Sequence, residues 1–151
     1  MRGNYLIGLM AGVAAAVVFV SATTGPLPMR VVLFLLTPLP LFLAGFGWGW
    51  ASTVIAGLIG TLAMALLTTP AVGAVFAISP AIPSAILIYL VTLNRPAPAP
   101  GPDVDPATGI EWYPVGRIVI WAAGISGLMA LAAVMMIGPD LDTLRGEVRK
   151  L

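Results

Sequence analysis

The fold is decided by one long stretch that carries no charge. Residues 31–94 read VVLFLLTPLPLFLAGFGWGWASTVIAGLIGTLAMALLTTPAVGAVFAISPAIPSAILIYLVTLN, 64 consecutive residues without Asp, Glu, Lys, Arg or His. A water-soluble domain of that length needs charged side chains on its solvent face. As a helix with a rise of about 1.5 Å per residue the stretch would extend roughly 96 Å, three times the thickness of a hydrocarbon core of about 30 Å. The sequence therefore predicts a polytopic membrane protein.

The composition of the whole chain agrees with this class and excludes several functions. Of the 151 residues, 60% are hydrophobic and 9% are charged, whereas an ordinary globular domain has roughly 25% charged residues. The chain contains no Cys and no His, which excludes thiol catalysis, disulfides and Cys/His metal sites. A net charge of +1 without a basic cluster argues against a nucleic-acid partner. We expect the lipid bilayer as the partner, and neither a metal nor a cofactor.

Turn residues divide the chain into apolar runs. We predict an all-α fold: a single transmembrane bundle of about five helices, one of them broken by prolines, and a short amphipathic C-terminal helix. The spans are expected at residues 5–22, 31–46, 51–67, 72–93 and 114–137, with a polar Pro-rich loop at 94–113 and the amphipathic tail at 139–151. The tail has leucines at helical spacing. Because it ends without a C-cap glycine, we expect the sequence to be incomplete at its C-terminus.

The first apolar run, residues 5–22, has two interpretations. A positive end followed by an apolar run and small residues fits a cleaved signal peptide, and the other interpretation is a retained first span. Gly8 and Gly12 form a small-xxx-small pair, and small residues at this spacing let helices approach closely in lipid. Ala123 and Gly127 give the fifth span a similar face. We expect these faces to serve helix packing or to bind a membrane-protein partner or a second copy of the chain.

Two features interrupt the first half of the uncharged stretch. Pro38 and Pro40 lie inside the span at 31–46, and such breaks are tolerated in lipid only where neighbouring protein or polar groups satisfy the freed backbone. The segment 45–50, rich in glycine and tryptophan, is interpreted as a turn with tryptophan anchors at the membrane interface. The alternative is a flexible loop that closes over a ligand.

The strongest candidate site lies in the fourth span, at Ser79, Pro80, Pro83 and Ser84. Two prolines three residues apart remove two backbone donors and clash with the preceding turn, so the helix should kink or unwind near mid-membrane. Freed carbonyls and the serine hydroxyls would then be available at depth, as in the broken helices of transporters. The alternative is a kink that serves packing only, since no charged residue accompanies the break.

The loop at 94–113 carries most of the remaining polar chemistry. Its Pro-rich segment 96–102 should be an extended polyproline spacer. Asp103, Asp105 and Glu111 lie close in sequence, and paired carboxylates are able to bind a cation or to carry protons. Nothing in the sequence fixes them in place, so we interpret this segment as a solvated loop.

Three passages of the sequence carry a family resemblance. They are LPLFLAGFGWG at 39–49, IPSAILIYL at 82–90 with Arg95 after it, and WYPVGR at 112–117. Together they resemble an uncharacterised family of bacterial polytopic membrane proteins, the YybS-like domain of unknown function in its alphaproteobacterial form, over essentially the whole chain. The resemblance implies a multi-pass protein of the bacterial cytoplasmic (inner) membrane, with further spans beyond the last residue given.

That family is similar, at the level of fold, to the substrate-binding subunits of energy-coupling-factor vitamin transporters. In those subunits a small-residue face on the first helix docks onto the coupling subunit, and Ala11 and Ala15 have such a spacing here. No ligand-specific motif accompanies the likeness, and a shared fold does not establish a shared function.

Two functions follow from these features. The first is a transporter-type substrate-binding subunit for a small neutral or apolar solute, because no buried charge awaits a counter-charge. The second is a non-transport membrane scaffold or partner-binding subunit of an envelope complex. We expect no enzyme and no catalytic residues, because the serines are not accompanied by His, Cys or a mid-membrane acid.

Overall fold

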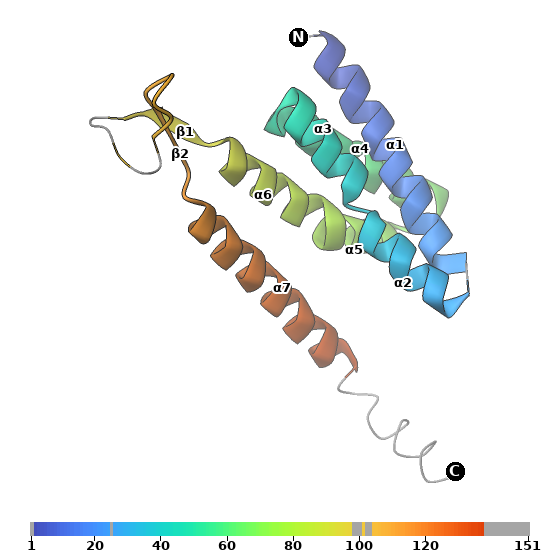
Figure 1. Ribbon diagram of the computed structural model, residues 1–151. Helices are drawn as coiled ribbons and strands as arrows, with labels where there is room; N and C mark the ends of the chain where they lie inside the picture. The colour runs from blue at the N-terminus through green and yellow to red at the C-terminus, as the bar shows by residue number, and fades with distance from the viewer. Residues whose placement is uncertain (1, 25, 98–100, 102–103, 138–151) are drawn as a thin grey trace.

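The chain forms a bundle of antiparallel helices with one short β-hairpin, as seen in a computed structural model (Figure 1). The structure describes residues 2–24, 26–97, 101 and 104–137. The elements in chain order are α1 (Arg2–Thr24), α2 (Leu27–Leu36), α3 (Leu39–Trp48), α4 (Trp50–Leu67), α5 (Pro70–Phe76), the π-helical turn η1 (Ala77–Ala81), α6 (Ile82–Thr92), β1 (Asn94–Pro96), β2 (Ile110–Trp112) and α7 (Val115–Ile137).

The predicted fold class is confirmed. Five helical segments of the described chain are long and apolar enough to cross a membrane, and two of them are built from more than one helix. They are Tyr5–Thr23, Pro28–Trp48 (α2 with α3), Trp50–Leu67, Pro70–Thr92 (α5, η1 and α6) and Val115–Ala132. The predicted amphipathic tail at 139–151 lies outside the described residues.

Small residues bring the first four spans together. Along α1 the buried positions include Gly8, Gly12, Ala15 and Phe19, which lie on one helical face. This face packs against α4, the most extensive helix contact of the bundle. Helix α1 thus supplies a large part of the core.

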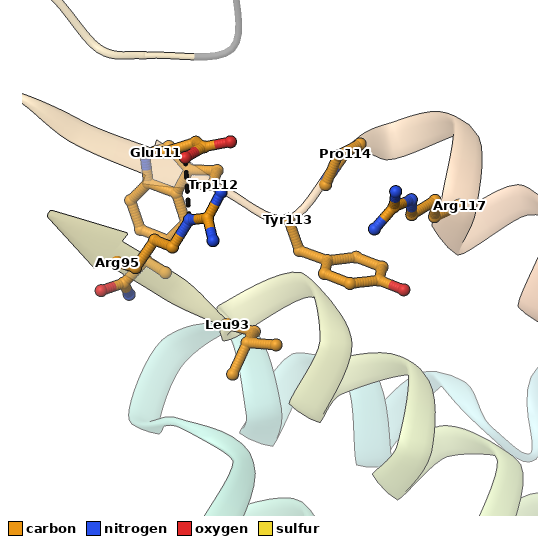
Figure 2. A pocket seen from close by; sticks show the side chains of 8 residues that line it. Leu93, Arg95, Glu111, Trp112, Tyr113, Pro114 and Arg117 are labelled. Atoms are coloured by element: carbon orange, nitrogen blue, oxygen red, sulfur yellow. Dashed lines mark hydrogen bonds and ion pairs between the residues drawn. The ribbon is translucent and has the colours of Figure 1, made fainter. Parts of the chain in front are cut away.

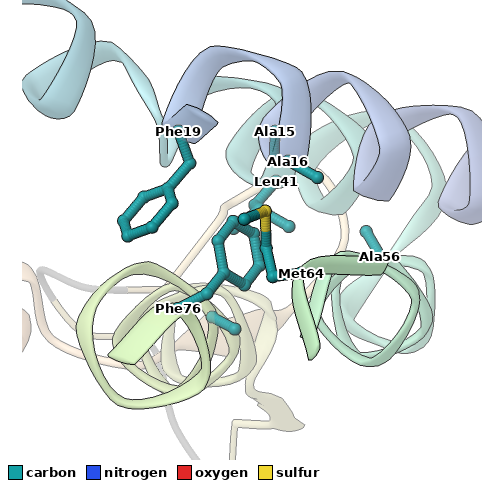
Figure 3. Close-up of a cluster of buried hydrophobic side chains, with 8 residues drawn as sticks. Ala15, Ala16, Phe19, Leu41, Ala56, Met64 and Phe76 are labelled. Carbon is teal, nitrogen blue, oxygen red and sulfur yellow. The ribbon is translucent and has the colours of Figure 1, made fainter. Parts of the chain in front are cut away.

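The centre of the core is aromatic. Phe76 is fully buried, and its ring meets that of Phe19 edge to face, with 5.3 Å between the ring centroids. Leu41 and Met64 complete the cluster from α3 and α4 (Figure 3). The core thus joins α1, α3, α4 and α5.

The turn in the glycine- and tryptophan-rich segment 45–50 is shorter than predicted. Helix α3 continues to Trp48, α4 begins at Trp50, and Gly49 between them has a φ of 88°, a value that favours glycine. Gly45, predicted in the turn, is instead buried inside α3, where an added Cβ would lie 2.7 Å from the Cγ2 atom of Ile88. A single-residue turn leaves no flexible loop here to close over a ligand.

Helix α7 stands apart from the compact part of the bundle. It extends away from the other helices beyond its contact with α6 (Figure 1), and no residue of its span Val115–Ala132 is buried. Its half-buried residues Ile118, Ala122, Ile125 and Met129 recur at helical spacing. The predicted small-residue face, Ala123 and Gly127, is exposed.

Candidate functional site

The proline breaks of two different spans line the same cavity. A cavity of about 310 Å³ lies between the α2–α3 break, the η1–α6 segment and α7, and we call it the lateral groove. Pro38 borders it from one broken span, and Ser79, Pro80, Pro83 and Ser84 border it from the other. All four candidate residues predicted from the fourth span therefore line one cavity.

The break in the fourth span takes the form of a π-helical turn. Pro80 has no N–H for the carbonyl of Phe76, and its ring would clash with that carbonyl in an α-helix. The chain widens by one residue instead: the Ile82 N–H donates to the Ala77 carbonyl, five residues back. The predicted kink or unwinding is therefore a π-bulge, a feature that is frequent at functional sites. Pro83 also removes the α-helical donor of the Ser79 carbonyl.

In the second span, the side chain of Thr37 satisfies a backbone carbonyl that the proline break leaves without its helical donor. Thr37 lies between α2 and α3 with 1% of its surface exposed. Its Oγ1 donates to the Leu33 carbonyl at 3.0 Å, and its N–H donates to the Phe34 carbonyl at 3.3 Å. Pro40 cannot donate to the Leu36 carbonyl, so that group lacks its helical partner. The sequence pointed to Pro38 and Pro40 as a break but not to their meeting with the fourth span.

The lining of the lateral groove is apolar and uncharged. Phenylalanine, leucine, isoleucine, methionine and proline side chains make up most of it, and none of the described residues that line it carries a charge. Its polar side chains are the hydroxyls of Thr37, Ser79, Ser84 and Ser126. Since the Thr37 hydroxyl already donates to the Leu33 carbonyl, the serines are the hydroxyls of this lining that would donate to an occupant. Ser126 was missed because a lone serine on a lipid-facing helix gives no signal in the sequence.

The small-residue faces predicted for packing or partners divide into two groups. Gly8, Gly12 and Ala15 are buried, and Ala11 packs beside the core. A Cβ added to Gly12 would lie 2.5 Å from the Ala56 carbonyl oxygen. The α1 face is thus packed against the chain's own α4, and Ala15 on it is fully buried. An added Cβ on Gly127 of α7 would meet no heavy atom within 4 Å.

A second cavity, of about 480 Å³, lies where the hairpin joins α6 to α7, and we call it the interfacial cavity (Figure 2). Arg95, Glu111, Trp112, Tyr113 and Arg117 contribute to its lining. The Arg95 Nε donates to the Glu111 Oε2 at 2.8 Å across the paired strands β1 and β2. This hydrogen bond and the charge of Arg95 hold the pKa of Glu111 below its ordinary value.

Nothing in the sequence fixes the three carboxylates of this loop, but two of them have defined partners in the structure. Besides the pairing of Glu111, Asp105 accepts from the Ala107 N–H and the Thr108 hydroxyl at 2.9 Å each, which lowers the pKa of Asp105. The described residues contain no group of three acids placed to hold a metal ion. Asp103 and most of the Pro-rich segment lie outside the described residues.

Comparison of the chain with protein-family models, curated proteins and solved structures finds no match. The resemblance to the YybS-like family therefore stays a prediction.

Proposed function

We propose that this chain is a membrane-embedded binding subunit, of transporter type, that holds a small neutral or apolar solute in the lateral groove. The observation that carries the proposal is the convergence of two proline-broken spans on one uncharged cavity. Broken helices provide backbone polar groups at depth in many transporters, and ligand sites of about 300–1,000 Å³ are mostly apolar with a few placed polar groups.

The apolar lining and the position of α7 support entry from the bilayer. Because α7 packs only loosely along α6, a solute dissolved in lipid reaches the groove without crossing the tightly packed first four spans. We place the protein in the bacterial cytoplasmic membrane, and this placement rests on the YybS-like resemblance.

The test uses two adjacent alanines of α7. Ala122 lines the groove, whereas Ala123 is exposed and does not. The purified full chain in neutral detergent is labelled with a long-chain alcohol that carries a photoreactive diazirine, and labelled peptides are mapped by mass spectrometry. Ala122→Leu should reduce labelling of residues 79–87 about fivefold, which corresponds to about 1 kcal/mol of binding free energy. Ala123→Leu should leave it unchanged, and equal labelling of both variants would refute the proposal.

A scaffold function is the second candidate, and the exposed small-residue face of α7 favours it. Ala123 and Gly127 offer the close helix approach that drives association in lipid, and the partner we propose is a second copy of the chain. Because the chain has no Cys, single-cysteine variants are informative. Ala123→Cys should form disulfide-linked dimers in membranes, whereas Ala122→Cys, at a half-buried position that lines the lateral groove, should not. Absence of dimers with Ala123→Cys would remove this candidate.

A further inference from the structure

The two cavities lie along the same pair of helices. The interfacial cavity is bordered by Leu93, directly after α6, and by Arg117 of α7, and the lateral groove by Leu87 of α6 and Ala122 of α7. At a rise of about 1.5 Å per residue, the two cavities are separated by roughly 8 Å along either helix. The polar end of the α6–α7 pair thus leads directly into its apolar part.

The interfacial cavity is cationic and carries interfacial aromatic residues. Arg95 is paired with Glu111, whereas Arg117 has no ion-pair partner among the residues that the structure describes. The charged residues of the lining therefore leave one net positive charge. Trp112 and Tyr113 lie beside them, and such rings are typical of the headgroup level of a membrane.

We propose that the ligand is an anionic amphiphile that occupies both cavities, with a lipid phosphate beside Arg117 and an acyl chain in the lateral groove. This inference rests on the groove being the binding site, as in the proposed function, and replaces the small neutral solute with a lipid whose apolar chain lies in the groove and whose charged headgroup lies outside it. The phosphate offers the planar guanidinium of Arg117 a charge-assisted hydrogen bond, and the apolar lining of the groove suits a hydrocarbon chain.

The dimensions of the α6–α7 pair agree with a lipid of one leaflet. On α7 the groove lining runs from Ala122 to Met129, which lie roughly 8 and 18 Å along the helix from Arg117. One leaflet contributes about half of a hydrocarbon core of about 30 Å, so an acyl chain reaches about 15 Å from its headgroup. A chain anchored at Arg117 therefore reaches most of the groove.

The experiment compares two lipids that differ only in their headgroups. Phosphatidylglycerol and phosphatidylcholine, each with the same photoreactive acyl chain, are added as minor components to phosphatidylcholine vesicles that contain the full chain. Labelling of the α6 and α7 peptides is expected to be about fivefold higher with phosphatidylglycerol, the preference that one basic residue near the headgroups supplies. Arg117→Gln should abolish this preference, and Arg117→Lys should restore most of it.

Arg30→Gln is the matched control, because Arg30 lies in α2, at the start of the span Pro28–Trp48 and at the opposite end of the bundle from the hairpin (Figure 1). It should leave the preference unchanged. Equal labelling by both lipids, or a preference that survives Arg117→Gln, would overturn the inference. Inorganic phosphate at constant ionic strength should not compete; if it does, the ligand is a soluble phosphate and the lipid assignment is wrong.

The neutral photoreactive alcohol separates failure of this inference from failure of the proposed function. Arg117→Gln should still be labelled by the alcohol at residues 79–87, which also shows that the variant is folded. Labelling by the alcohol without a headgroup preference refutes the lipid assignment alone. If the headgroup preference is seen but Ala122→Leu does not reduce labelling, the groove is not the site of the acyl chain, and the proposed function is refuted as well.

Discussion

Replacing Gly12 by alanine tests the contact that holds the first and third spans together. The added Cβ would lie 2.5 Å from the Ala56 carbonyl oxygen and 3.0 Å from the Ile59 Cβ atom. Moving the first contact from 2.5 Å to an ordinary 3.4 Å requires a shift of about 0.9 Å, and the obstructing atom belongs to the backbone, which cannot rotate away. Overpacking of this kind costs about 1–3 kcal/mol, so we expect the free energy of unfolding of Gly12→Ala to be lower by that amount than that of a Gly→Ala variant without the clash.

The assay is an unfolding titration with sodium dodecyl sulfate in mixed micelles, followed by circular dichroism. Gly127→Ala on α7 is the control, because its added Cβ meets no heavy atom within 4 Å while the gain in helix propensity, up to about 1 kcal/mol, is the same. The difference between the two variants isolates the steric cost. If both unfold at the same detergent fraction, the close approach of α1 and α4 does not stabilise the bundle and the packing argument is wrong.

Three further predictions use other contacts. Phe76→Ala should lower the unfolding free energy by about 3–5 kcal/mol in the same titration, because the ring is fully buried in the core. Thr53→Val keeps the side-chain shape but removes a buried hydrogen bond to α3, and should cost about 0.6 kcal/mol in that titration. The pairing of Glu111 with Arg95 stabilises the folded hairpin fully above the ordinary pKa of the carboxyl, and this stabilisation should be lost as the pH falls through the lowered pKa of Glu111. Amide hydrogen exchange in the hairpin, normalised to intrinsic exchange rates, should then accelerate. Glu111→Gln should remove that part of the pH dependence and leave the part due to Asp105.

The spans themselves could be read from the sequence because lipid imposes a simple requirement. Every backbone group must be satisfied within a helix, and every side chain that faces lipid must be apolar. The stretch at 31–94 has no charged side chain and departs from α-helix only at its turns and proline breaks, and the ends of the observed helices lie close to the predicted ones. The proline breaks were predictable for the same local reason, since Pro38 and Pro80 lack a donor wherever they stand.

The contacts between spans could not be read in this way. The spacing of Gly8 and Gly12 indicates a face that something approaches closely, but it does not say that the partner is α4 of the same chain. The lateral groove depends on two breaks that lie about forty residues apart, at Thr37 and Ser79, coming to face one another. The hairpin was missed because its ion pair joins Arg95 to Glu111, sixteen residues later, across a segment whose prolines favour an extended spacer.

The attachment of α7 links the hairpin to the groove. In lipid the hydrophobic effect does not drive helices together, so association depends on close packing and hydrogen bonds. The smallest residues of α7, such as Gly127, face away from α6 and leave it without the close approach that Gly12 gives α1. What fixes the start of α7 beside α6 is the Tyr113 N–H, which donates to the Leu93 carbonyl at 3.0 Å, together with the paired strands before it. Weakening the hairpin with acid should therefore change photolabelling of the groove as well as amide exchange. Exchange that responds to pH while labelling stays constant would mean that α6 holds α7 without the hairpin.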